Sequence, residues 1–303
     1  MEEGQELTRD QVCVVGLGYV GLTLAVTMAD AGFQVTGIEK RDDVKKKLRA
    51  GQPHFFETGL EILLKRVTEN EQFTISDDIG EESDIFIITV GTPLDDCGEV
   101  RLDMVQEAAA LVADRARSGA LVIMRSTLKL GTTRDLIFPI LERRLDEFDL
   151  AFCPERTLEG EALKELLSLP QIVGGINQKS AIRAANLFQL ITPTVVRVSS
   201  PEAAEMIKLV DNSQRDVAFA YSNEIASICD ESDVSALEVI RAGKLGYPRT
   251  NLFVPGPVGG PCLSKDPHIL AEGARQRGVA AGLTLMARKV NESQPKQVAE
   301  RLG

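Results

Sequence analysis

The clearest chemical pattern in this sequence lies around Cys262, which follows a glycine-rich loop. Gly259 belongs to that loop, and Cys262 stands four residues before Asp266, with Lys265 between them. A predicted helix start and a nearby lysine both favour the thiolate, which is the reactive form of cysteine. A buried structural cysteine is the commoner fate of this residue type. The flanking glycines and charges nevertheless favour a nucleophile here.

A second pair of polar residues lies on a long predicted helix. Lys208 and Asn212 are four residues apart, so they share one helix face. An ammonium and an amide that point into a cleft together can hold and polarise an alcohol or carbonyl oxygen. A solvated helix face is the ordinary alternative for such a pair.

The segment from Gly16 to Gly21 reads GLGYVG and has the GxGxxG spacing. An apolar strand is predicted before it and a helix after it, and the next strand ends at the acidic Glu39. This context indicates a dinucleotide site. Gly16 permits a tight turn, Gly18 lets a pyrophosphate approach the backbone, and Gly21 allows close packing of helix on strand. A flavodoxin-like turn without a dinucleotide is the alternative.

The residues beside the glycines are further candidate coenzyme contacts. Tyr19 and Val20 open the predicted helix, whose N-terminus favours the anionic pyrophosphate. Glu39 would accept hydrogen bonds from ribose hydroxyls and repel a 2′-phosphate, which favours NAD over NADP. Lys40 and Arg41 follow directly, and their charges soften that preference.

Three further polar turns follow predicted strands, at the sheet edge where open α/β sheets bind ligands. They contain Thr92 in VGTP, Thr127 in RST, and the segment from Glu155 to Glu159 in CPERTLEG. Taken singly, each is equally consistent with ordinary turn chemistry.

Alternating strand and helix patterns place these turns on an α/β fold, a Rossmann doubly wound parallel sheet. After Pro201 the pattern becomes all-helical, with one long central helix capped by Ser200. The second helix after strand 34–38 is predicted to start with Thr58 as its cap. We therefore predict an NAD-binding domain at 1–199, a helical domain at 200–294 and a short C-terminal segment at 295–303. The predicted strands are 12–16, 34–38, 84–90, 120–126, 149–153, 171–175 and 194–198; the main predicted helices are 19–31, 43–49, 59–67, 201–229, 234–242, 267–277 and 280–291.

Composition excludes several classes of protein. The 303 residues suffice for two domains, and the net charge of −11 argues against a nucleic-acid binder. Five scattered cysteines and two histidines indicate a reducing compartment and no metal centre. The N-terminal sequence lacks a secretory signal and no segment predicts a membrane span, so we expect a cytoplasmic protein.

Together these segments resemble the UDP-glucose/UDP-N-acetylmannosamine dehydrogenase family. The likeness rests on six motifs in order, and CPER and the RDV after Asn212 are closer to the UDP-N-acetylmannosamine branch. The motifs are GLGYVGL, VGTP, STxxxGTT, CPERxLEG, KxxxNxxRDVxxxxxNE and GGxCxxKD. The resemblance implies oxidation of the C6 alcohol of a UDP-sugar to a carboxylate, with two molecules of NAD.

The resemblance also implies roles for the candidate residues. Cys262 would capture the intermediate aldehyde as a thiohemiacetal that becomes a thioester. Lys208 and Asn212 would stabilise developing oxyanions, and Asp266 with Thr127 would hold or activate water.

Further contacts follow from the same likeness. Glu155, Arg156 and Glu159 would line the substrate site, and Arg249 and Gly259 would bind substrate, with Arg249 contributed across a dimer. Lys208 and Asn212 would also touch the substrate. Besides the glycine loop, the coenzyme contacts would include Thr92, Thr127, Glu159 and Lys265.

The resemblance also bears on assembly and completeness. The long helix at 201–230 would form a homodimer, and the family's C-terminal UDP-binding domain would begin where this sequence stops. We expect part of the UDP contact surface to be missing. Two other hypotheses stay open: a 3-hydroxyacid-type dehydrogenase that makes one hydride transfer, and an NAD-binding homologue without turnover.

Overall fold

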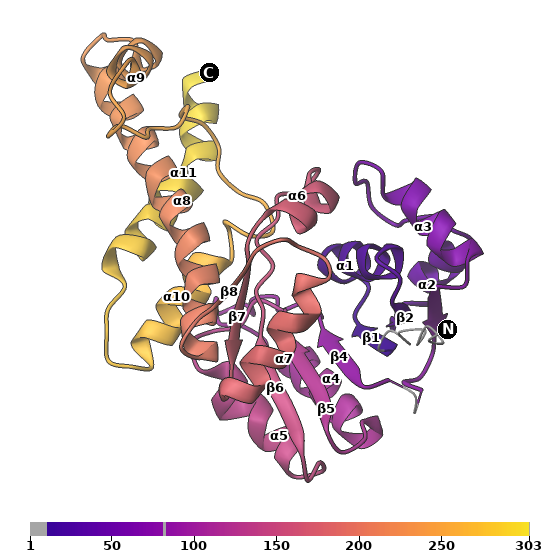
Figure 1. Cartoon of the computed structure of the whole chain (residues 1–303). Helices are drawn as coiled ribbons and strands as arrows, with labels where there is room; N and C mark the ends of the chain where they lie inside the picture. Colours follow the sequence, from indigo (N-terminus) through magenta and orange to yellow (C-terminus); the bar gives the residue numbers. More distant parts are fainter. Residues whose placement is uncertain (1–10, 81–82, 303) are drawn as a thin grey trace. The chain divides into compact units, whose positions relative to one another are not determined.

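The computed structural model describes residues 11–80 and 83–302, which form two compact units (Figure 1). The first unit contains residues up to 92 and residues 101–205. The second contains residues 93–100 and the chain from 206 onward. The boundary after Glu205 therefore falls inside one helix, a few residues beyond the predicted domain boundary at 200.

The first unit is built around an eight-stranded sheet in the order β3-β2-β1-β4-β5-β6-β7-β8. The first six strands have the Rossmann order. The order in which strands are added to the sheet reverses between β1 and β4, which is the topological switch point of this fold. The strands are β1 (Gln11–Val15), β2 (Gln34–Ile38), β3 (Phe73–Ser76), β4 (Ile85–Ile88), β5 (Ala120–Met124), β6 (Phe148–Phe152), β7 (Gln171–Gly175) and β8 (Val195–Arg197).

Helices cover both faces of this sheet, as Figure 1 shows. Val12 and Val14 of β1 join Leu22 and Phe188 in the main hydrophobic core, because alternate residues of a strand point to the same face. The helices are α1 (Tyr19–Asp30), α2 (Asp42–Arg49), α3 (Leu60–Glu69), α4 (Asp103–Arg115), η1 (Thr133–Ile137, a π-helical turn), α5 (Phe138–Glu142), α6 (Ala162–Ser168) and α7 (Gln178–Gln189).

The second unit is helical and contains most of the long helix α8 (Pro201–Glu231), which has 31 residues. It also contains α9 (Ala236–Lys244), α10 (Asp266–Arg275) and α11 (Gly282–Leu302). Ser200 caps α8 as predicted, because its Oγ accepts a hydrogen bond from the Ala203 N–H at 3.2 Å. The predicted α/β fold class with a long central helix is confirmed.

Four details differ from the sequence prediction. The sheet is not wholly parallel, since β7 runs antiparallel to β6. The prediction missed β3, at Phe73–Ser76. Helix α3 begins after Gly59, whose φ of +82° suits glycine, and not after a Thr58 cap. Helix α11 continues through Pro295 to Leu302, beyond the predicted helix end at 291. None of the described helices is both long and apolar enough to cross a bilayer.

Candidate functional site

The glycine loop of the first unit has the geometry that dinucleotide binding needs. Gly16 has φ +94°, and a Cβ at Gly21 would lie 1.8 Å from the Gly16 carbonyl oxygen. A Cβ at Gly18, in contrast, would meet no atom within 4 Å. The loop is therefore tight on its inner side and open at Gly18, where the first turn of α1 offers amides that lack partners within the helix.

Glu39 lies at the end of β2 and is tied to this loop. Its Oε2 accepts a hydrogen bond from the Leu17 N–H at 3.0 Å, and its Oε1 accepts one from Arg41 N–H at 2.9 Å. The two following cations have acidic partners: Lys40 bonds Glu107 at 2.5 Å and Arg41 bonds Asp43 at 2.6 Å. Because these charges are already paired, the arrangement favours a ribose hydroxyl over a 2′-phosphate.

A buried glutamate that sequence analysis missed connects Tyr19 to the CPERTLEG segment. Glu57 accepts hydrogen bonds from the Tyr19 hydroxyl at 2.5 Å, the Gly160 N–H at 2.8 Å and the Ala162 N–H at 3.0 Å. Burial, and then the bond to Glu57, raise the pKa of Tyr19. Val20 follows in the first turn of α1, and Glu159 is exposed just before Gly160. Only the position of Glu57 before a helix could have indicated it.

The turns after β4 and β5 lie side by side in the first unit. The Thr92 hydroxyl donates to the Thr127 carbonyl oxygen at 2.8 Å, and Ser126 Oγ donates to the Val90 carbonyl oxygen at 2.7 Å. Two residues predicted to contact the coenzyme are thus brought together at the carboxyl edge of the sheet.

Glu155 is buried and has partners on both oxygens. Arg125 donates to its Oε2 at 2.6 and 3.2 Å, and the N–H groups of Arg156 and Thr157 donate to its Oε1 at 2.7 and 2.8 Å. Burial acts to raise the pKa of Glu155, but Arg125 and these bonds together hold it below its usual range. The Arg156 guanidinium bonds the Pro170 carbonyl at 2.7 Å. This geometry favours a structural role for Glu155 over a catalytic one.

The second unit brings together the predicted residues around Asp266. Asp266 is the first residue of α10 and is fully buried. Its Oδ2 accepts a hydrogen bond from Asn212 Nδ2 at 2.6 Å, while its Oδ1 is buried without a hydrogen-bond partner. Burial raises the pKa of Asp266, against the opposing charge of Lys208. Asn212 therefore bonds this carboxylate, and the charge of Lys208, one turn earlier on the same helix, acts on it.

Cys262 and Lys265 belong to the same neighbourhood. Burial lowers the pKa of Lys265, and the charges of Asp266, Cys262 and Lys208 all act on it. Cys262 itself is an exposed free thiol in the turn before α10. Its carbonyl oxygen accepts the N–H of Asp266 at 2.9 Å, so the backbone of Cys262 helps to begin the helix.

The remaining predicted contacts lie elsewhere on the second unit. Gly259 is exposed in the loop before Cys262. Arg249 lies in the loop after α9, with its guanidinium 4.5 Å from the centre of the Tyr247 ring. The predicted contact of Arg249 across a dimer stays a prediction.

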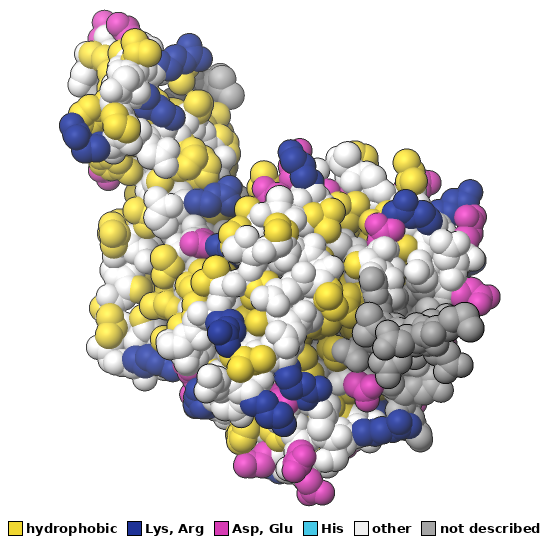
Figure 2. Space-filling view, viewed as in Figure 1, with side chains coloured by type: hydrophobic (Ala, Val, Ile, Leu, Met, Phe, Trp, Pro, Cys, Tyr) yellow, Lys and Arg dark blue, Asp and Glu magenta, His cyan; other side chains and the backbone are white. Residues whose placement is uncertain are grey.

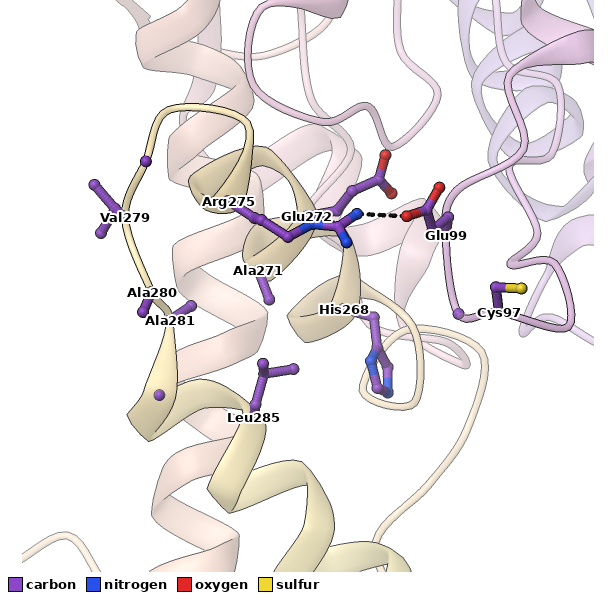
Figure 3. Close-up of a pocket in the computed structure, with 13 residues that line it drawn as sticks. Cys97, Glu99, His268, Ala271, Glu272, Arg275, Val279, Ala280, Ala281 and Leu285 are labelled. Carbon is purple, nitrogen blue, oxygen red and sulfur yellow. Dashed lines mark hydrogen bonds and ion pairs between the residues drawn. The ribbon is translucent and has the colours of Figure 1, made fainter.

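The second unit also has an open cavity of about 600 Å³ between α10, the start of α11 and the 97–99 turn (Figure 3). Arg275 pairs with Glu99 across it, and Glu272 accepts the Val100 N–H at 2.8 Å. None of the residues that we predicted lines this cavity, and its charged groups already have partners. The cavity therefore offers no comparable chemistry.

Charged side chains of both signs lie on the surface of the first unit. On the face of the first unit seen in Figure 2, Lys and Arg are interspersed with Asp and Glu and gather in no broad basic area. A nucleic-acid binder needs a basic patch that follows the phosphates.

Comparison with known protein families gives a consistent result. Residues 10–192 match the NAD binding domain of the UDP-glucose/GDP-mannose dehydrogenase family, and residues 202–293 match the central domain of that family. The UDP-N-acetyl-D-mannosamine dehydrogenase of Campylobacter jejuni is 34% identical over 306 aligned residues, which cover 97% of this chain and 74% of that protein.

Two further relatives show the same relationship. The NDP-N-acetyl-D-galactosaminuronic acid dehydrogenase of Ralstonia nicotianae is 32% identical to this chain. The alignment covers 100% of this chain and 73% of that protein. The structure of a UDP-D-ManNAc dehydrogenase from Pyrococcus horikoshii superimposes with a TM-score of 0.89 at 34% identity, over 96% of this chain and 70% of that one. The predicted family and coenzyme are thereby confirmed: this chain belongs to the UDP-glucose/GDP-mannose dehydrogenase family and contains its NAD binding and central domains.

Proposed function

We propose that this chain oxidises the C6 alcohol of a UDP-N-acetylhexosamine, with UDP-N-acetylmannosamine as the first candidate. The carrying observation is the fully buried Asp266, which is bonded to Asn212 on one oxygen and lacks a hydrogen-bond partner on the other. A buried acceptor without a partner is costly in a folded protein, so it marks a place for a substrate hydroxyl or a water. The mannosamine dehydrogenase of Campylobacter jejuni supports the choice of sugar.

The glycine loop fits the coenzyme, since Gly18 leaves open space and Glu39 lies beside the loop. Bound NAD supplies the acceptor for the hydride in each oxidation. The chain's own groups do the remaining work, and Lys208 and Asn212 stabilise the oxygen at C6 while it bears negative charge.

Cys262 completes the proposed scheme by keeping the aldehyde on the protein. Its sulfur adds to the aldehyde carbon, and the carbonyl oxygen takes up a proton, which gives a thiohemiacetal. The second oxidation converts this adduct to a thioester. Water held at Asp266 then attacks the thioester carbon, releasing the carboxylate product and the thiolate of Cys262. Without this bond the aldehyde would escape between the two oxidations.

We keep the roles predicted for the remaining candidate residues. Thr92, Thr127 and Glu159 lie on the coenzyme-binding unit, and Arg156, Arg249 and Gly259 are proposed substrate contacts. We retain the division at residue 200 as the functional boundary between the coenzyme domain and the catalytic helices.

Assembly and location are part of the same proposal. Met206, Val210, Tyr221 and Ile228 leave an apolar stripe on α8 that is between 38% and 56% exposed, which supports a homodimer through residues 201–230. A charge placed in the stripe by Val210→Lys should give a monomer in light scattering. All five cysteines, each in the described part of the chain, are free thiols, which supports a cytoplasmic location.

The test counts NADH released for each UDP-N-acetylmannosamine consumed. We expect two for the wild type, and Cys262→Ser should remove the second. Cys97→Ser is the matched control, because Cys97 is also exposed and belongs to the same unit. One NADH per substrate in the wild type would support a single-hydride dehydrogenase. Calorimetric binding of NAD without turnover of any UDP-sugar would support a binding protein. The same assay with the galactosamine and glucose epimers decides the sugar.

A further inference from the structure

A buried polar network joins helices α8 and α11 in the second unit. Arg288 of α11 has a side chain only 2% exposed, and its Nη1 donates to Asp216 Oδ1 of α8 at 2.5 Å. Asn291, one turn later, donates to the same oxygen at 2.9 Å and to the Asp216 carbonyl at 2.9 Å. Asn223 of α8 donates to Asn291 Oδ1 at 3.0 Å. A buried charge of this kind needs all of its partners.

This network also binds the loop that carries Cys262. The guanidinium of Arg288 donates to the Leu263 carbonyl at 2.8 Å and approaches the Val258 carbonyl at 3.4 Å. These two carbonyls lie on either side of Cys262 in the sequence. Only a planar group with several N–H donors in a fixed fork can reach both carbonyls and Asp216 together.

A second anchor lies earlier in the same loop. Asn223 donates from Nδ2 to the Gly256 carbonyl at 3.1 Å and accepts the Gly256 N–H on its Oδ1 at 2.7 Å. The loop is thus fastened at residues 256, 258 and 263. Between these anchors, Gly259, Gly260 and Cys262 are exposed. A glycine-rich exposed segment has little order of its own.

We propose that Arg288, supported by Asp216, Asn223 and Asn291, is a positioning residue that holds the Cys262 loop in its reactive geometry. This inference deepens the proposed function and rests on Cys262 as the nucleophile. Arg288 acts on the reaction only through the backbone on both sides of the thiol. Asn223 on α8 and Arg288 on α11 therefore hold the loop against both helices.

The test removes the guanidinium of Arg288 while keeping the second unit folded. Arg288→Met alone leaves a buried carboxylate without its cation, so it is combined with Asp216→Asn. Arg288→Lys keeps the charge but cannot reach both carbonyls. Lys289→Met is the matched control, because Lys289 is the exposed neighbour on the same helix. All variants are made in the full chain and checked by thermal unfolding.

Two measurements follow. In the two-step oxidation, the double variant should lose about 100-fold in kcat, the loss expected from misplacing a reacting group by about 1 Å. Arg288→Lys should lie between the double variant and the wild type, and KM for NAD should stay within about two-fold, since the coenzyme loop belongs to the other unit. By hydrogen exchange, the amides of Ser264, Lys265 and Asp266 should exchange about ten-fold faster in the double variant, while those of α9 stay unchanged.

A folded double variant with wild-type kcat and unchanged exchange at 264–266 would overturn the inference. An equal rise in exchange over α9 would show that Arg288 merely stabilises the whole unit, which also overturns it. If the wild type shows no two-step oxidation, the proposed function fails instead, and the exchange measurement still judges whether Arg288 fixes the loop.

Discussion

A buried glutamate at the start of α8 should make the stability of the first unit fall as pH rises. Glu205 is fully buried and accepts three hydrogen bonds from the segment that follows Thr127. The donors are the Gly131 N–H at 2.5 Å, the Thr133 N–H at 2.8 Å and the Thr133 hydroxyl at 2.6 Å. Burial raises the pKa of Glu205 from 4.5 to about 7, although these bonds oppose the rise.

The sign follows from proton binding in the two states. Between pH 4.5 and 7 the folded chain keeps a proton on Glu205 that the unfolded chain has lost, so the free energy of unfolding decreases as pH rises. The stabilisation that comes from the protonated Glu205 side chain is fully present below pH 4.5 and is lost once the pH has risen through 7. At about 1.4 kcal/mol for each pH unit, the loss amounts to about 3 kcal/mol.

The assay compares thermal unfolding of the wild type and Glu205→Gln between pH 5 and 8.5. Glutamine does not titrate, so the wild type should lose about 3 kcal/mol relative to the variant. For a unit of this size that is a relative fall in melting temperature of roughly 6–12 °C.

Glu202→Gln is the matched control on the same helix turn. Partial burial acts to raise the pKa of Glu202, but hydrogen bonds from Arg134 and Ser200 hold it below its usual value. Its stabilisation is therefore present above the unfolded pKa and is lost as pH falls, so it has the opposite sign. A wild type that gains stability over Glu205→Gln as pH rises would refute the reasoning, because the three donors would then outweigh burial.

Three further predictions concern the candidate site. Gly18→Ala should leave the melting temperature unchanged yet weaken NAD binding at least about ten-fold in calorimetry, because the open space at Gly18 is where the pyrophosphate approaches. Gly21→Ala should weaken NAD binding and also lower the melting temperature, and equal stability of the two variants would contradict this. Arg125→Met should destabilise the chain by about 3–5 kcal/mol in denaturant unfolding, since it leaves the buried Glu155 without its cation; a cost below about 1 kcal/mol would show that Glu155 is not held by this pair. Asp266→Asn should reduce kcat by about 100-fold or more without loss of thermal stability, because it removes a proton acceptor and also a costly buried charge; retained activity would exclude Asp266 from water activation.

The sequence alone was sufficient for the local parts of this molecule. Short apolar runs predicted nearly all strands, and a run of helix formers without proline or glycine after Pro201 predicted the long helix, because these signals are local in the sequence. The glycine loop and Glu39 could also be predicted from the sequence. A tight turn, close approach of the pyrophosphate to the backbone, and an acid at the end of the next strand are all local requirements. The shared helix face of Lys208 and Asn212 followed from helix geometry in the same way.

Only the tertiary structure decided which polar groups meet. No pattern in the chain indicates that Glu155 is neutralised by Arg125, that Glu57 joins Tyr19 to Gly160, or that Arg288 grips the backbone on both sides of Cys262. These contacts join residues 25 to 103 positions apart, and the direction of β7 likewise depends on how a connection turns back. Local propensity contains no information about such distances, because burial and partner choice are set only when the elements pack together.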